Sequence, residues 1–524
     1  MLTYKLGLTL ENLYKSILSI EIMGREEQII NERLRKISEL NELGINPYPH
    51  KYEVKDKAYD LQEKFKELKN EASGKYKTRI AGRLMTFRDL GKIAFGVLRD
   101  GTGTIQIVLQ SGETPEKIQE FFKKFIDAGD FIGVEGEIFR TKRGELSVIV
   151  NSGELLSKAI KPLPEKWHGL QDKEERYRKR YLDLIMNPEV KEVFEKRSKI
   201  ISLIRDFFKA EGFLEVETPV LQNIYGGASA TPFKTYLNAL EIDVFLAISP
   251  ELYLKRLIVG GYEKVFTICK NFRNEGIDRQ HNPEFMMLEY YIAYENYEYH
   301  INITEKLFSF LLRELGIKDK IDYYGKKINL KPPFKRIKFR DLVLKETEID
   351  IDKFNNFESL KKVIQVKKIK GVNIKESKHY GALLDELYKR IVRPSIIQPT
   401  FLTHYPVEMI ALAKRNEKDK SKINSVQLVV DGAELVKSYD ELNDPLDQEA
   451  RFDEQEKLLR TGDDEAMPKD EDFIDALKYG MPPTAGYGLG IDRLIMLLTG
   501  QDSIKDVILF PFMKPLGKNE AKNK

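Results

Sequence analysis

The chain has 524 residues, of which 42% are apolar and 32% charged, with a net charge of +3. This length favours two or three domains. The near-neutral balance argues against a protein that coats DNA, but it allows a local basic face for one RNA. Cys269 is the single cysteine, which excludes an internal disulfide and a cysteine-based zinc site and favours the cytoplasm. We expect no membrane span, because no run of about 18 apolar residues occurs.

The amino-terminal part is expected to be a short extension followed by a helical segment. Residues 1–22 carry apolar residues at helical spacing, but charges interrupt them too early for a secretory signal. We therefore expect a dispensable extension, with a membrane-surface or partner helix as the alternative. Residues 25–43 have one charged amphipathic pattern that ends before Gly44 and Pro47, which predicts a helix within a segment at 23–75.

Residues 76–160 carry a different pattern. The runs "RIAGRLMTF", "KIAFGVLRDGTGTIQIVLQ", "DFIGVEGEIFR" and "GELSVIV" are rich in branched and aromatic residues. A turn at Asp100 and Gly101 joins two of these strands. About five strands, with one helix near residues 115–126, are typical of a small barrel of the oligonucleotide-binding (OB) type.

A second, larger domain is expected at 187–515, between a linker at 161–186 and a flexible tail at 516–524. A helical pattern at 188–212 leads into the strand-like run "FLEVETPVL", after which strands recur in antiparallel-looking pairs with helices between them. Alternating β–α–β units with a phosphate-binding loop do not occur. The sequence thus predicts an α+β protein, with an amino-terminal OB-type barrel followed by an antiparallel sheet flanked by helices.

The stretch "FRNEGIDRQHNPEF" joins two apolar strand-like runs and is unusually rich in charge. Strand alternation places Arg273 and Glu275 on one face, and the returning run "EFMMLEYYIAY" places Glu289 and Tyr291 on one face. A guanidinium suits phosphate or carboxylate oxygens, and the carboxylates would accept from ammonium or amide donors. The alternative is an arginine–glutamate ladder on a solvated sheet face.

The run "GMPPTAGYGLGIDRLIMLLTG" predicts a glycine-rich strand that leads into a helix. Arg493 falls in the first turn of this helix, where the helix dipole disfavours a cation. We therefore expect an anionic or π-rich group near it, and a nucleotide is both. Simple solvent exposure of Arg493 is the alternative.

These segments together resemble the class II aminoacyl-tRNA synthetases, and within them the lysyl type. "GFLEVETPVL", "FRNEGIDRQHNPEF" with "EYY", and "GYGLGIDRLIMLL" are similar to the three motifs of the class. "GGASATPF", "SPELYLKRLIVGGYEKVF" and "YDELNDP" add lysyl-type stretches. The resemblance covers residues 25–515 and implies an enzyme that attaches L-lysine to tRNA-Lys with ATP, through a lysyl-adenylate. A cytoplasmic homodimer is also implied.

The resemblance implies which residues bind ATP and act in catalysis. Arg273 would bind the α-phosphate and the substrate carboxylate, and Glu275 would hold the adenine amino group or the tRNA acceptor end. Phe285 and Arg493 would enclose the adenine ring by stacking and cation–π contact. His281 would reach the γ-phosphate. Arg273, Glu275 and Arg493 are the implied catalytic residues.

The same resemblance implies a lysine-binding pocket. Glu251 would receive the α-ammonium with help from the backbone at Gly227, while Arg273 would hold the carboxylate. Glu441 and Tyr291 would bind the side-chain ammonium at the far end.

Departures from the family pattern concern the metal site. Glu434 is the one metal-binding carboxylate present, because Gln427 stands where the family usually has a second. Lys437 stands where the family commonly has asparagine near the substrate carboxylate, and its ammonium would take over part of the role of Mg²⁺. We expect Mg²⁺ as a cofactor, with the number of ions left open.

The barrel would read the anticodon through Arg88, Phe95 and Gln106, which is also implied by the resemblance. A paralogue that ligates lysine or a related amino acid to a non-tRNA acceptor is the rival interpretation. Such paralogues typically resemble the catalytic domain alone, so the barrel argues against this rival. A pure RNA-binding protein with an inactive catalytic domain is disfavoured by the intact Arg273, Glu275 and Arg493.

Overall fold

The computed structural model describes residues 24–164, 170, 172–462 and 466–516. The chain divides into two compact units, residues 1–169 and 170–524. The extension expected at 1–22 lies outside the described residues, as does all of the expected tail beyond residue 516. No described helix is both long enough and apolar enough to traverse a membrane.

The first unit contains a closed five-stranded barrel, which confirms the OB-type prediction. Its strand order is β1-β2-β3-β5-β4, and only β3 and β5 pair in parallel. The strands are β1 (Ser73–Asp89), β2 (Ile93–Arg99), β3 (Thr104–Gln110), β4 (Phe131–Arg140) and β5 (Leu146–Ser157). The helices are α2 (Arg25–Glu42), α3 (Ala58–Lys64) and α4 (Glu116–Phe125), and α2 and α4 lie where the sequence predicted them. Alternate residues of β2 are buried inside the barrel, as period-two patterning requires.

Helix α2 is attached to the barrel mainly through polar groups. Arg33 donates to the carbonyl oxygens of Ala159 and Ala128, both at 2.8 Å. Lys36 Nζ lies 2.9 Å from Asp127 Oδ1, and the same aspartate pairs with the fully buried Lys158. Apart from Leu40, the buried residues of α2 are these two cations. Charge complementarity therefore provides much of this contact.

The second unit is built on an eight-stranded, mainly antiparallel sheet, as predicted. Its order is β14-β15-β16-β17-β18-β11-β10-β6, and the pairs β14–β15 and β6–β10 are parallel. The strands are β6 (Leu214–Glu215), β10 (Lys264–Phe272), β11 (Glu284–Ala293), β14 (Lys335–Lys338), β15 (Thr400–Thr403), β16 (Ser425–Val430), β17 (Ala433–Asp440) and β18 (Thr484–Gly490).

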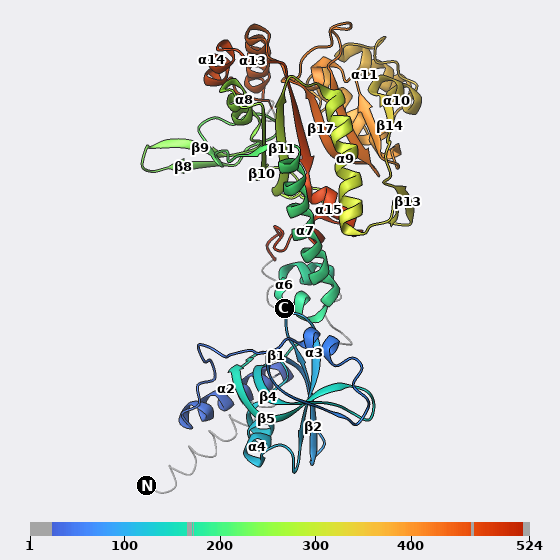
Figure 1. Cartoon of the computed structure of the whole chain (residues 1–524). Helices are drawn as coiled ribbons and strands as arrows, with labels where there is room; N and C mark the ends of the chain where they lie inside the picture. Colours follow the sequence, from blue (N-terminus) through green and yellow to red (C-terminus); the bar gives the residue numbers. More distant parts are fainter. Residues whose placement is uncertain (1–23, 165–169, 171, 463–465, 517–524) are drawn as a thin grey trace, which may run out of the picture. The chain divides into compact units, whose positions relative to one another are not determined.

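Two smaller sheets accompany it. Their strands are β7 (Leu221–Gln222), β8 (Lys234–Leu237) and β9 (Ile242–Leu246) in one, and β12 (Lys320–Tyr323) and β13 (Lys326–Asn329) in the other. The β8–β9 hairpin extends away from the main sheet (Figure 1).

One face of the main sheet is closed by the apolar sides of three helices. These are α7 (Pro188–Ala210), α9 (Tyr297–Leu315) and α15 (Ile491–Thr499), and α9 lies along the sheet in Figure 1. Phe208, Leu307 and Leu494 pack there against inward-facing strand residues such as Leu288 and Tyr487. This large core fixes the strands whose opposite face carries the candidate site.

The opposite face is covered only towards its ends. The helices there are α8 (Glu251–Val259), α10 (Phe339–Thr347), α11 (Phe357–Val366), α12 (Tyr380–Leu387), α13 (Pro445–Arg460) and α14 (Glu471–Lys478), and they share a second core. The remaining helical segments are α5 (Lys173–Arg178), α6 (Arg180–Met186), α16 (Ile504–Val507), the π-helical turn Tyr388–Val392, and the 3₁₀ turns Arg393–Ser395 and Val407–Met409.

Two segments differ from the expected elements. The run "FLEVETPVL" was predicted as one strand, but it forms only β6 and β7 at its two ends. Pro219 has no N–H to donate to a strand partner, which accounts for the interruption. Within the expected linker at 161–186, the described residues form α5 and α6.

Candidate active site

Strand β18 forms the floor of the main cavity, and the residues that face the cavity are glycines. Gly486, Gly488 and Gly490 of β18 line this cavity of about 790 Å³, while the intervening Tyr487 and Leu489 point into the core. Strand β18 lies between β11 and β17, so side chains of both neighbours project over the glycines. A Cβ added to Gly486 would lie 2.5 Å from Tyr291 Cε1 and even closer to Glu441 Oε1. The alternating glycines therefore create the space for a ligand.

A buried cluster of charges adjoins the cavity, which is lined by two members of the cluster, Glu251 and Tyr439. Lys255 Nζ lies 2.6 Å from Glu251 Oε1 and forms an ion pair with Glu441 Oε2. Tyr439 Oη donates to Glu251 Oε2 at 2.8 Å. Burial lowers the pKa of Lys255, but Glu251 and Glu441 outweigh it, so the pKa lies above its ordinary value. Two elements thus meet here, because Lys255 and Glu251 come from α8, Tyr439 comes from β17 and Glu441 directly follows β17.

The carboxylate of Glu441 lacks hydrogen bonds. The residue is 1% exposed, and neither of its oxygens has a hydrogen-bond partner among the described residues, although Oε2 forms the ion pair with Lys255. An unpartnered buried carboxylate oxygen is costly, so its position favours an arriving ammonium. Burial raises the pKa of Glu441 well above its ordinary value, and the Lys255 ammonium is the largest influence in the opposite direction.

Tyr291 and Gly227, both predicted to bind lysine, line the same cavity. Tyr291 is opposite Gly486 across β11 and β18 and is buried. Gly227 has a left-handed backbone with φ of +84°, and a Cβ there would lie 2.8 Å from the Glu251 Cβ. Only glycine therefore allows the backbone to approach Glu251 this closely.

Glu289 adds a third buried carboxyl group, which strand alternation predicted on the same face as Tyr291 but to which the resemblance gave no role. It lies opposite Gly488 on the neighbouring strand, and it accepts a hydrogen bond from Ser249 Oγ at 3.1 Å. Burial, reinforced by the charge of Glu251, raises the pKa of Glu289 to about 8. Glu251, Glu289 and Glu441 thus place three buried carboxyl groups near one ammonium, and the charge that they carry depends on pH.

Arg273 and Phe285 lie at the mouth of the hairpin formed by β10 and β11. Strand β10 ends at Phe272, and the Arg273 backbone N–H donates to Pro283 O at 2.9 Å. The Arg273 guanidinium carbon lies 5.0 Å from the Phe285 ring centroid. Both side chains line the cavity, together with the exposed Glu275. The hairpin thus presents a cation, a carboxylate and an aromatic ring to the same space.

The loop between these strands contacts α15. His281 Nε2 lies 3.1 Å from Arg493 Nη2, and His281 Nδ1 lies 2.8 Å from Asp278 Oδ2. Arginine can only donate, so Nε2 accepts and Nδ1–H donates to Asp278. Arg493 also donates to the backbone oxygen of Glu434 at 2.9 Å. The two predicted ATP ligands His281 and Arg493 are therefore neighbours, and Arg493 is in the first turn of α15 as expected.

The predicted metal-site positions contain a single free carboxylate, that of Glu434. Gln427 Oε1 accepts hydrogen bonds from the hydroxyls of Tyr405 at 2.7 Å and Tyr388 at 3.4 Å. Lys437 lies directly opposite Gln427 on the adjacent strand. No group of three His, Cys, Asp or Glu residues suited to a metal occurs in the described part of the chain. These residues do not fit a metal held by two carboxylates. They fit an ion bound by Glu434 and by phosphate oxygens of ATP.

In the first unit, the predicted anticodon-reading residues share one surface. Arg88 lies opposite Phe95 in the β1–β2 pair, and Gln106 lies opposite Val97 in the β2–β3 pair. Since Phe95 and Val97 both alternate with buried residues, all three predicted residues are on the outer face of the barrel. Gln106 Oε1 accepts from Ser147 Oγ at 2.9 Å, which fixes its amide.

Comparison with known proteins matches both units. The family of class II tRNA synthetases for D, K and N matches residues 172–514, and the OB-fold nucleic acid binding domain matches residues 78–156. A lysine–tRNA ligase of Pelotomaculum thermopropionicum is 47% identical over 499 residues, covering 95% of this chain and 97% of that protein. The chain belongs to the class II lysine–tRNA ligase family.

Other members of this family are similarly close. Lysine–tRNA ligase 2 of Methanosarcina mazei is 48% identical over 92% of this chain and 94% of that protein. The lysine–tRNA ligase of Campylobacter jejuni is 45% identical over 94% of this chain and 98% of that protein. Lysine–tRNA ligases use tRNA and ATP as substrates, generally with Mg²⁺.

Proposed function

We propose that this protein activates L-lysine with ATP to form lysyl-adenylate and then transfers the lysyl group to tRNA-Lys. The observation that carries the choice of amino acid is the buried Glu441 carboxylate, which has no hydrogen-bond partner among the described residues and whose Oε1 lies beside Gly486 of the cavity floor. A side-chain ammonium supplies the charged donor that this oxygen lacks. Aspartate and asparagine, the other amino acids that the matched family covers, offer no cation at that position, and an acidic side chain would be repelled.

In the first step the lysine carboxylate attacks the α-phosphorus of ATP. A C–O–P bond forms, the bond between the α- and β-phosphates breaks, and pyrophosphate leaves with the bonding electrons. Arg273 would bind both reacting groups, because its planar fork can contact the α-phosphate and the substrate carboxylate together. Mg²⁺, when bound through Glu434 and the phosphates, would supply positive charge for the leaving group.

The remaining substrate contacts divide between the two ends of the cavity. Glu251 would receive the α-ammonium, with the close backbone of Gly227 beside it, and Tyr291 with Glu441 would receive the side-chain ammonium. At the nucleotide end, Phe285 and Arg493 would enclose the adenine while His281 reaches the γ-phosphate. Glu275 would hold the adenine amino group or the tRNA end, and Lys437 would lie near the substrate carboxylate.

In the second step a ribose hydroxyl at the tRNA end attacks the carbonyl of the adenylate, and AMP leaves. The outer barrel face would bind the anticodon, with a base stacked on Phe95 and polar contacts from Arg88 and Gln106. A non-tRNA acceptor, the rival considered from the sequence, is not favoured, because the chain carries the nucleic-acid-binding barrel and matches its relatives almost throughout.

We further propose a cytoplasmic homodimer. The edge strands β6 and β7 and the projecting β8–β9 hairpin expose apolar side chains that a second copy would cover. These are Leu214, Val220, Leu221, Tyr236 and Leu240, which are 47–65% exposed. Sedimentation equilibrium should give twice the mass of one chain, and Leu221→Lys combined with Leu240→Lys should shift it to one.

The amino-acid choice is tested by pyrophosphate exchange. Wild-type protein is incubated with ATP, labelled pyrophosphate and each of the twenty amino acids in turn, and then charging of tRNA-Lys is measured with the amino acid preferred. Lysine should support the fastest exchange. Faster exchange with another amino acid would contradict the assignment, and exchange without tRNA charging would revive the non-tRNA acceptor.

A further inference from the structure

Lys255 is a buried ammonium paired with Glu251, which lines the cavity, and none of the substrate contacts above uses it. Its side chain is fully buried on α8, between the carboxylates of Glu251 and Glu441. The rings of Tyr439 and Phe473 lie 5.9 Å and 5.8 Å from Nζ. A buried amine stays protonated only when it is paired with negative charge. The carboxylates of Glu251 and Glu441 therefore stabilise the charged form of Lys255.

The two oxygens of the Glu441 carboxylate have different surroundings. Oε2 forms the ion pair with Lys255, whereas Oε1 lies next to Gly486, which lines the cavity, and neither oxygen has a hydrogen-bond partner among the described residues. A carboxylate held at one oxygen by a fixed ammonium cannot rotate freely. The free oxygen therefore keeps one direction, towards the cavity floor.

Glu441 would be poorly ionised without this neighbour. Burial disfavours its charged form, and the nearby carboxylates of Glu251 and Asp440 act in the same direction. A protonated Glu441 would present a neutral acid to the substrate. Such a group binds a hydroxyl about as well as an ammonium, so the pocket would lose discrimination by charge.

We propose that Lys255 is a positioning and specificity-determining residue, whose ammonium holds Oε2 of Glu441 and favours the ionised carboxylate, so that Oε1 receives the side-chain ammonium of lysine. This inference rests on the proposed function. A lysine residue of the protein thus orients and helps to ionise the carboxylate that binds the side chain of the lysine substrate.

The pH dependence involves every ionisable group that faces this cluster. These groups are Glu251 on α8, Glu289 and Tyr291 on β11, Tyr439 and Asp440 on β17, Glu441 itself, and Arg273 beyond Glu289. In Lys255→Met the Glu441 proton is held more tightly, so lysine binding must release it. The penalty is greatest at low pH and falls as pH rises.

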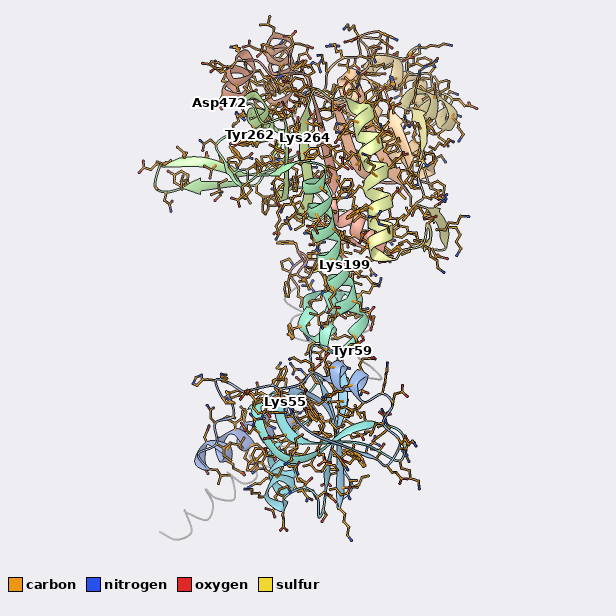
Figure 2. All side chains as sticks on the ribbon, viewed as in Figure 1. Lys55, Tyr59, Lys199, Tyr262, Lys264 and Asp472 are labelled. Atoms are coloured by element: carbon orange, nitrogen blue, oxygen red, sulfur yellow. The ribbon has the colours of Figure 1, made fainter. Side chains whose placement is uncertain are left out.

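The test measures the lysine KM in pyrophosphate exchange from pH 6.5 to 9. Relative to wild type, Lys255→Met should raise the KM about tenfold or more at pH 7, and this ratio should approach one as pH rises. Discrimination between L-lysine and 6-hydroxy-L-norleucine should fall about tenfold. Arg256→Met is the control, since it removes a cation from the same helix that pairs instead with Asp470 and Asp472 (Asp472 is labelled in Figure 2).

A double-mutant cycle separates positioning from folding. In a Glu441→Gln background there is no carboxylate to ionise, so Lys255→Met should change the lysine KM by less than about threefold. Equal effects in both backgrounds, or a KM ratio that does not change with pH, would overturn the role of Lys255. If Lys255→Met does not fold, Lys255→Gln replaces it, with the same expected KM ratio. A wild type that activates no lysine overturns the proposed function as well, which distinguishes the two failures.

Discussion

Gly486→Ala tests whether the space above the glycine floor is the lysine site. The added Cβ would lie 2.5 Å from Tyr291 Cε1, whereas real Cβ atoms essentially never approach closer than 3.0 Å. It would be closer still to Glu441 Oε1, so the carboxylate must move furthest. The backbone of Gly486 is extended strand, so alanine brings no conformational strain there, and the effect is local.

The expected loss follows from this displacement. A hydrogen bond to a charged group contributes about 1.5–3 kcal/mol. Its loss from the substrate ammonium raises the lysine KM about 10- to 150-fold, since 1.4 kcal/mol corresponds to tenfold. A misplacement of about 1 Å in an active site costs a similar factor. The ATP KM should change little, because Arg273, Phe285 and Arg493 lie away from the new methyl group.

Pyrophosphate exchange at varied lysine and at varied ATP measures both constants in one preparation. Gly101→Ala provides the matched control, because a Cβ there meets nothing within 4 Å and the residue belongs to the barrel. An unchanged lysine KM in Gly486→Ala would refute the assignment of this space. A parallel rise in both KM values would point to general distortion of β18 instead.

Three further predictions concern other parts of the protein. Phe95→Ala should impair tRNA charging by about 1–3 kcal/mol while leaving lysine-dependent exchange intact, and equal losses in both assays would contradict separate anticodon binding. Lys437→Asn should slow adenylate formation, and added Gln427→Glu should restore much of the rate at high Mg²⁺; a magnesium titration of exchange that matches wild type would exclude this role. Glu289 has a folded pKa of about 8 against an ordinary 4.5, so its contribution to stability is present below pH 4.5 and is lost as pH rises through 8. Glu289→Gln should therefore flatten the thermal melting temperature between pH 5 and 8.5, and an unchanged slope would argue against a neutral Glu289.

The strands around the site could be predicted because a two-residue period fixes which side chains share a face. Glu289, Tyr291 and the glycines of β18 follow that rule directly, and Arg493 follows from its place in the first helical turn. The interruption of the run "FLEVETPVL" could also have been predicted, because Pro219 lies inside it.

Lys255 was not predictable in the same way. A glutamate followed four residues later by a lysine on a helix is the usual pattern of a solvent-exposed ion pair. Only the packing of β17 and α14 against α8 buries this pair and brings Glu441 to it. The engagement of Gln427 by Tyr388 and Tyr405 likewise depends on segments far apart in the chain. Long-range packing of this kind leaves no local pattern.

The polar attachment of α2 to the barrel has a thermodynamic consequence. Releasing this helix breaks the contacts of Arg33, Lys36 and Asp127 and uncovers Leu40 with the half-buried Ile29, Ile30 and Ile37, a small apolar set beside the core of the barrel. Its opening should therefore have a small heat-capacity change and a weak dependence on urea, which both follow exposed area, and a strong dependence on ionic strength. Hydrogen exchange in α2 would then respond to salt while exchange in the barrel strands responds to denaturant, so that one small domain contains two regions of different physical sensitivity.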